Sequence, residues 1–243
     1  MHGTLEEIQI ISKKIIQGDL RVYFSLISLF FVVISGKPAV YITAFLIFSA
    51  LSLHAAGKYY LKITRVPVYF LTSSMVVLAL FIPGNPVFRI LALPFAITDE
   101  GLKTAAITGI RAFASLSVLS YLVLTTTIPE IFSAFKRLRM PDFVVETALL
   151  MYRAIQILMD EAMRLDRAAS SRLGYASKRA FVNTAALLSY SLFIKSLVRA
   201  ERLDSAMEAR CYQGAIPVLE NFSSGYRYVS LILVLLIAAW MVG

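Results

Sequence analysis

The sequence is poor in charge, and this scarcity limits what kind of protein it can be. Only 16% of its 243 residues are charged, against about 25% in an ordinary soluble domain, while 58% are hydrophobic. So few polar groups cannot cover a water-facing surface, which excludes an ordinary cytosolic protein. The 16 Phe and 12 Tyr exclude a disordered chain, which would be poor in aromatic residues. We therefore expect the lipid bilayer to be the solvent of this chain.

Motifs for catalysis and nucleotide binding are also missing. The single cysteine, Cys211, excludes an intrachain disulfide and a structural zinc site. Neither His2 nor His54 lies in a metal-binding motif of the HExxH kind, and there is no Gly-x-Ser-x-Gly nucleophile elbow. The sequence has no GxxxxGK[ST] phosphate loop, so it cannot hydrolyse ATP by that route. We expect no metal, no cofactor and no enzyme activity in this chain.

Long hydrophobic runs are what the sequence does contain. A helix needs about 20 mainly apolar residues to cross a bilayer, and five runs come close to that length: residues 20–35, 38–56, 66–82, 105–128 and 228–243. Apart from Arg21 at the start of the first run, the ionisable groups that come close are His54 and Arg111, and we interpret these two as interfacial or helix-pairing side chains. The runs predict an all-α polytopic integral membrane protein with about five transmembrane helices. Thr4 and Glu7 are spaced as a capping box, which predicts a surface helix before the first run.

Positive charges alternate between the loops of this first part. Residues 1–21 and residues 58–65 each hold three Lys or Arg, whereas the turn between the first two runs has only Lys37. Lys and Arg are retained on the cytoplasmic side of membrane proteins. The alternation therefore predicts a cytoplasmic N-terminus in a multi-pass protein of the cell membrane. Part of the excess of basic residues is thus expected at the inner leaflet of the membrane, and we expect no nucleic-acid partner.

The composition changes after residue 128. Residues 129–228 hold 14 Lys+Arg and 10 Asp+Glu, far more densely placed than in the first part, and they follow a helical period. The first long helix is expected at about 142–172, between Pro141 and Gly174. The change predicts three parts: an N-terminal membrane domain with a surface helix and four transmembrane helices (1–128), a cytoplasmic domain of long amphipathic helices (129–227), and a final transmembrane helix (228–243).

Residues 181–198 are ambiguous, because Lys195 is their only charge. A crossing here would place the arginines that follow outside the cell, against the positive-inside bias. We interpret the segment as a helix at the cytoplasmic boundary, and a true transmembrane span stays the alternative. A separate helix is expected at about 198–210, ended by Gly214 and Pro217.

Two arginines 38 residues apart are the most informative feature of this domain. Each follows a small residue in the last turn of a long helix, so its guanidinium can enter a narrow groove and bind a carboxylate through several donors. The ordinary alternative is an arginine that complements the helix dipole. Two such ends in one domain favour a binding role. The candidate site residues are Ser171, Arg172 and Leu173 at the first end and Ala209, Arg210 and Cys211 at the second.

The order of these motifs resembles a known family, the transmembrane T component of energy-coupling factor (ECF) transporters. This EcfT-like family includes the cobalt transport proteins of the Q type. The resemblance covers most of the chain and rests on the following residues in order: Asp19 and Arg21, Glu100-Gly101-Leu102, Arg111, Thr126-Thr127, Pro129, Glu130, Leu138, Pro141, Arg153, Glu161, Ala168 and the two arginine ends. Leu173 and Cys211 stand where the family often has glycine, which leaves open whether the local turn is the same.

The resemblance implies a coupling protein of a prokaryotic cell membrane. In this family the T component joins two cassette (ABC) ATPases to a membrane S component that captures the substrate, and the ATPases bind the ATP. Arg172 and Arg210 then match the coupling residues that enter grooves on the two ATPases. The cobalt branch implies cobalt or nickel as the substrate, and a B vitamin is the alternative.

Two other functions are alternatives for this sequence. One is a stand-alone channel or carrier. The other is a membrane-embedded enzyme for lipid substrates, with Asp160, Glu161, Arg164 and Asp166 as a polar site. The helical spacing of these four residues is more typical of a solvated stripe than of an active site.

Overall fold

The computed structural model describes Gln9, Ser12 and residues 18–82, 86–89, 96–212 and 225–242, with backbone alone for 86–89 and 96–98. The chain divides into two compact units: one contains Met1–Ala134 and Glu220–Gly243, and the other contains Phe135–Leu219. The predicted surface helix lies almost wholly outside the described residues, as do Gly214 and Pro217.

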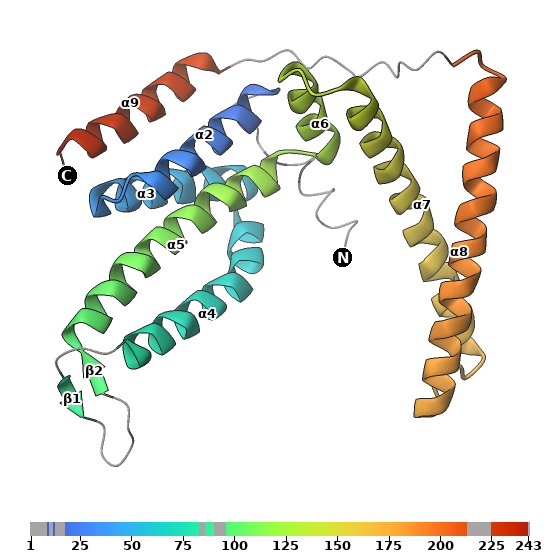
Figure 1. The fold of residues 1–243 in the computed structure, drawn as a ribbon, viewed down its shortest axis with the longest axis horizontal. Coiled ribbons are helices and arrows are strands. Elements are labelled where there is room, and N and C mark those ends of the chain that lie inside the picture. Colours follow the sequence, from blue (N-terminus) through green and yellow to red (C-terminus); the bar gives the residue numbers. More distant parts are fainter. Residues whose placement is uncertain are drawn as a thin grey trace. The chain divides into compact units, whose positions relative to one another are not determined.

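The predicted apolar runs are all helices of the first unit (Figure 1). They are α2 (Leu20–Ile34), α3 (Pro38–Ala56), α4 (Lys58–Phe81), α5 (Asp99–Thr125) and α9 (Tyr226–Val242). By length and composition α3, α4 and α5 can cross a membrane, and α2 and α9 are shorter apolar helices. The prediction of an all-α polytopic membrane protein is confirmed. α4 and α5 begin earlier than their apolar runs, because their first turns are helical but charged.

α5 lies against α2, α3 and α4, and this contact forms the core of the first unit. Ala44 of α3 and Ala114 of α5 are fully buried, and such small residues let membrane helices approach closely. The ring of Phe48 packs between Phe24 and Tyr121, with centroid distances of 5.3 and 5.8 Å. α9 packs on α3.

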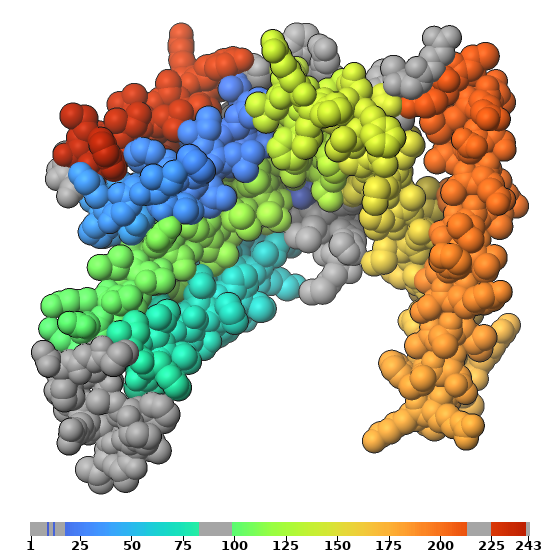
Figure 2. Space-filling model, viewed as in Figure 1, coloured from blue at the N-terminus to red at the C-terminus, as the bar shows by residue number. Residues whose placement is uncertain are grey.

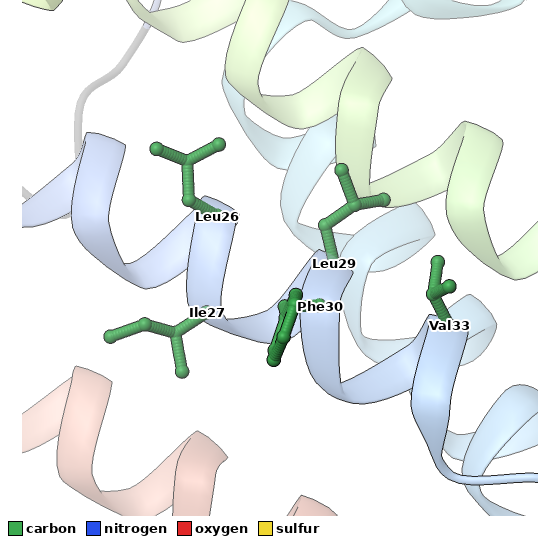
Figure 3. Close-up of a pocket in the computed structure, with 5 residues that line it drawn as sticks. All are labelled: Leu26, Ile27, Leu29, Phe30 and Val33. Atoms are coloured by element: carbon green, nitrogen blue, oxygen red, sulfur yellow. The ribbon is translucent and has the colours of Figure 1, made fainter.

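The outer side of the first unit is apolar. A shallow cavity of about 480 Å³ on α2 is lined by carbon side chains only (Figure 3): Leu26, Ile27, Leu29, Phe30 and Val33. Val66 and Phe70 of α4 are more than 70% exposed, and the outer sides of α4 and α5 can be followed in Figure 2. So much contiguous apolar surface is unusual for a soluble monomer but suits contact with lipid.

Between α4 and α5 the structure has a small two-stranded sheet, which matches none of the elements expected from the sequence. Strands β1 (Pro86–Arg89) and β2 (Ala96–Thr98) pair antiparallel. Asp99 and Glu100 follow in the first turn of α5, where negative charge favours the positive end of the helix dipole.

The second unit is built from two long helices, reached through α6 (Ile128–Arg137). α7 (Asp142–Ser171) has the bounds that the sequence predicts to within one residue. α8 (Lys178–Glu208) corrects the prediction of two helices at 181–198 and 198–210, because it is one helix of 31 residues. Leu, Arg, Ala and Glu are good helix formers, so the change at residue 198 from apolar to charged residues alters the environment and not the backbone. Ser177 caps the start of α8, where its hydroxyl oxygen accepts a hydrogen bond from the Ala180 N–H at 3.2 Å.

Candidate functional site

α7 and α8 form an antiparallel hairpin (Figure 1). Near the turn, the Thr184 hydroxyl donates to the carbonyl of Gly174 at 2.8 Å. Halfway along, Lys195 of α8 forms an ion pair with Glu161 of α7, and Arg164 lies 3.4 Å from the same carboxylate. The pKa of Glu161 is lowered, chiefly because Lys195 donates a hydrogen bond to it. These contacts hold the two helices together between their ends.

The turn after α7 carries the first candidate arginine. Arg172 is the C-cap, and Leu173 follows with φ of 58°, in the left-handed region. The N–H of Gly174 donates to the carbonyl of Ala169 at 2.9 Å, and that of Leu173 donates to Ser170 at 3.2 Å. This pair of hydrogen bonds defines a Schellman motif, the turn that usually has glycine at its left-handed position.

The turn after α8 repeats the same arrangement around Arg210. Cys211 has φ of 54°, the Tyr212 N–H donates to Met207 at 3.1 Å, and the Cys211 N–H donates to Glu208 at 2.9 Å. Leu173 and Cys211 therefore form this turn although neither of them is glycine. Both adopt the left-handed conformation, although it costs an L-residue roughly 1–2 kcal/mol.

A third turn of this kind ends α6, where Arg139 itself has φ of 62° and the Met140 N–H donates to Phe135 at 3.3 Å. In the described part of the chain, the residues other than glycine with positive φ are these three alone. Backbone strain that recurs at equivalent positions is a reason to look for function there.

Both candidate arginines are exposed. Among the described residues, no carboxylate forms an ion pair with Arg172 or Arg210. The residues before them are small, and the Ser171 hydroxyl donates back to the carbonyl of Ala168 at 3.0 Å, away from the guanidinium. Each turn therefore presents an accessible cation with five N–H donors.

The hairpin places the two arginines far apart. Arg172 lies at the junction of α7 and α8, and Arg210 lies at the other end of α8. Since α8 has 31 residues, a rise of about 1.5 Å per residue separates them by roughly 45 Å. One small groove on a partner cannot hold both guanidinium groups.

A tyrosine fixes each turn to α7, and sequence analysis missed both tyrosines. The Tyr175 hydroxyl donates to Asp166, and the Tyr212 hydroxyl donates to Glu146 at 2.6 Å. The pKa of both tyrosines is raised, chiefly by these hydrogen bonds to carboxylates. A Tyr within three residues of each arginine was the available signal. Its partners could not be singled out, because Asp166 and the buried Glu146 are 20 residues apart on α7, at nearly opposite sides of the helix, and share no sequence pattern.

Of the four residues considered as an enzyme site, three are engaged in contacts within the α7–α8 hairpin. Glu161 binds Lys195, and Asp166 accepts from Tyr175. No group of three or more metal-ligating side chains occurs within the described residues.

A buried polar cluster in the first unit joins motifs more than 100 residues apart. Arg21, 1% exposed, lies 3.7 Å from Glu130 and also donates to the carbonyl of Thr125. The Ser133 hydroxyl donates to Asp19 at 2.9 Å. The 19–21 and 126–130 motifs are separate in the sequence, and the structure shows that they meet. The cluster ties the start of α2 to the first turns of α6.

Comparison with known proteins places the chain among transport proteins. The family model CbiQ, described as cobalt transport protein, matches residues 9–220. A cobalt transport protein CbiQ of Rhodobacter capsulatus is 30% identical over 178 residues, which cover 73% of this chain and 70% of that protein. An energy-coupling factor transporter transmembrane protein EcfT of Heliobacterium modesticaldum is 31% identical over 174 residues, or 62% of this chain and 64% of that protein.

The chain is also 29% identical over 209 residues to a putative fused cobalt transport protein CbiMQ of Methanocorpusculum labreanum. This match covers 83% of the chain and 35% of that longer protein, so the chain spans about a third of its length. Since the family model covers most of the sequence, the chain belongs to the CbiQ family of cobalt transport proteins.

Proposed function

We propose that this chain is the transmembrane T component of an ECF-type importer, which couples two cassette ATPases to a substrate-binding membrane S component. One observation supports this above the others: the same turn presents an exposed arginine at both ends of a single hairpin. Two equivalent contact points roughly 45 Å apart suit two copies or homologues of one partner. ATP is then bound and hydrolysed by those partners.

In this proposal, the segments Ser171-Arg172-Leu173 and Ala209-Arg210-Cys211 enter acidic grooves on the two ATPases. A guanidinium enclosed in such a groove binds a carboxylate through paired hydrogen bonds and loses its water, so its removal costs more than that of an exposed pair. Movement of the ATPases shifts the hairpin. α6 carries this movement to the first unit, where Glu130 and Arg21 hold its first turns.

The relatives' names favour cobalt as the substrate. We propose cobalt or nickel uptake, with a B vitamin as the alternative, because substrate choice belongs to the S component. The N-terminus is assigned to the cytoplasm of a prokaryotic cell, in line with the charge bias of the loops. α8 is assigned to the cytoplasmic membrane boundary, and its apolar residues face lipid or the S component.

Charge reversal tests the proposal. The chain is co-expressed with its ATPases, and the variants Arg172→Glu, Arg210→Glu and the double variant are purified from membranes. We expect each single variant to retain less ATPase than the wild type and the double variant to retain the least, because like charges then face each other in the grooves. Arg65→Glu/Arg227→Glu is the matched control, since both residues are exposed but lie in the first unit.

Equal recovery of the ATPases with the wild type and the double reversal would exclude the assigned role. Substrate flux through the purified chain in liposomes that contain no ATPase would instead favour a stand-alone channel or carrier.

A further inference from the structure

A cleft of about 540 Å³ lies between α7 and α8 and carries an excess of positive charge. Arg164 of α7 and Lys195, Arg199 and Arg202 of α8 line it, with Glu161 as its one carboxylate. The cleft lies beside the Lys195–Glu161 ion pair and is separate from the Arg172 and Arg210 turns.

The ion pairs of the cleft leave two guanidinium groups without a carboxylate. Glu161 is shared by Lys195 and Arg164, whereas Arg199 and Arg202 form no ion pair with any described residue. The carboxylates of α8 in this region do not compensate, because residues 201, 204 and 208 lie on other sides of the helix at about 100° per residue. Arg199 and Arg202, three residues apart, share the side that faces α7.

The rest of the lining is apolar, including Ile157 of α7 and Val198 and Leu203 of α8. A cleft with two unneutralised cations beside hydrocarbon side chains complements an amphiphile, which has an anionic group next to an alkyl chain.

The position of the cleft along α8 agrees with a lipid ligand. The preceding part of α8 is apolar enough to cross a membrane, and none of its residues is buried by the described chain. The placement rests on the proposed function, which assigns α8 to the cytoplasmic membrane boundary, so that the basic residues after its apolar part lie level with the lipid phosphates of that leaflet. We propose that this cleft binds an anionic phospholipid, with its phosphate between Arg199 and Arg202 and an acyl chain against Val198 and Leu203.

Lipid titration followed by native mass spectrometry tests this site in the purified full-length chain. The probe is dioleoylphosphatidylglycerol, with dioleoylphosphatidylcholine as the neutral lipid. We expect preferential binding of the anionic lipid to the wild type and a loss of affinity of about 25-fold in Arg199→Gln/Arg202→Gln, from about fivefold per cation. Arg199→Lys/Arg202→Lys keeps the charge and retains most of the affinity.

The control is Arg167→Gln/Arg179→Gln, which removes the same charge from exposed positions of α7 and α8 outside the cleft. It is expected to bind the anionic lipid as the wild type does. Size-exclusion profiles verify that every variant is folded.

Three results would overturn the site. The first is equal affinity of the Arg199→Gln/Arg202→Gln variant and the control, and the second is displacement of the lipid by inorganic phosphate at the same concentration. The third is unchanged lipid binding with loss of the ATPases, which would make the cleft a protein contact. Because the Arg172→Glu/Arg210→Glu variant keeps this cleft, its lipid binding separates a failure of this proposal from a failure of the coupling role.

Discussion

The two units of the chain use the same side chain in opposite ways. In the first unit Arg21 is 1% exposed, faces Glu130 and donates to a backbone carbonyl, so its charge is compensated within the fold. In the second unit Arg172 and Arg210 are exposed and have no acidic partner among the described residues. A buried arginine whose charge is compensated therefore stabilises this protein, whereas an exposed arginine at a strained turn is available to bind another molecule.

The largest effect is expected from breaking the buried cluster. Arg21→Ala leaves Glu130 without its cation, and breaking a buried ion pair in this way costs about 3–5 kcal/mol. Arg172→Ala is expected to change stability by less than about 0.5 kcal/mol, because its side chain is exposed. Thermal unfolding of the purified chain in detergent measures both. Equal unfolding temperatures for the two variants would contradict the comparison.

A smaller effect is expected at the first turn. A Cβ on Gly174 would lie 2.9 Å from the carbonyl oxygen of Ala169 and 2.9 Å from the hydroxyl of Thr184. The carbonyl belongs to the backbone and cannot move away cheaply, so Gly174→Ala is expected to cost about 1–3 kcal/mol. Thermal unfolding measures this cost, and under the proposed coupling role the variant is expected to retain less ATPase on co-purification than the wild type. An unchanged unfolding temperature would mean that the turn is not rigid.

The backbone strain of the two arginine turns can be removed by substitution with glycine. Leu173→Gly removes the cost of a left-handed residue, and because Leu173 is 75% exposed, no packing is lost. Each of Leu173→Gly and Cys211→Gly is expected to stabilise the hairpin by about 1 kcal/mol, after allowance for the greater freedom of glycine in the unfolded chain. A rise in unfolding temperature is the expected result. A fall would show that these side chains make contacts that stabilise the turns.

The smallest effect concerns pH. The pKa of Tyr175 and of Tyr212 is raised above its ordinary value of 10.0 by a carboxylate partner. Their hydrogen bonds therefore stabilise the hairpin fully below pH 10.0, and this stability is lost as the pH rises through the raised pKa. Unfolding temperatures between neutral and strongly alkaline pH measure the loss. Tyr175→Phe/Tyr212→Phe is expected to weaken this dependence, and an unchanged profile would exclude the tyrosines as its cause.

Much of the fold follows from local sequence, because hydropathy and helix boundaries are local properties. The apolar runs predict α2, α3 and α9 closely, and Pro141 and Gly174 mark the ends of α7. The break at residue 198 was wrong because a change from apolar to charged residues alters the surroundings of a helix without ending it.

The site was only partly predictable. Arg172 and Arg210 were singled out from their positions at helix ends, whereas the pairing of Arg21 with Glu130 depends on a long-range contact that no local pattern reports. The left-handed turns at Leu173 and Cys211 oppose residue preference, since glycine is favoured there. Main-chain hydrogen bonds impose the turn in both places.

Thiol labelling tests most directly whether both arginine turns contact partners at once. Cys211 is exposed and is the only cysteine of the sequence, and Ser171→Cys/Cys211→Ser moves the thiol to the first turn. Asp160→Cys/Cys211→Ser places it midway along α7 as the control. In the isolated chain, maleimide is expected to label all three positions. In the complex with the ATPases, protection is expected at positions 211 and 171 and continued labelling at position 160. Full labelling at either turn in the complex would contradict the proposed coupling role.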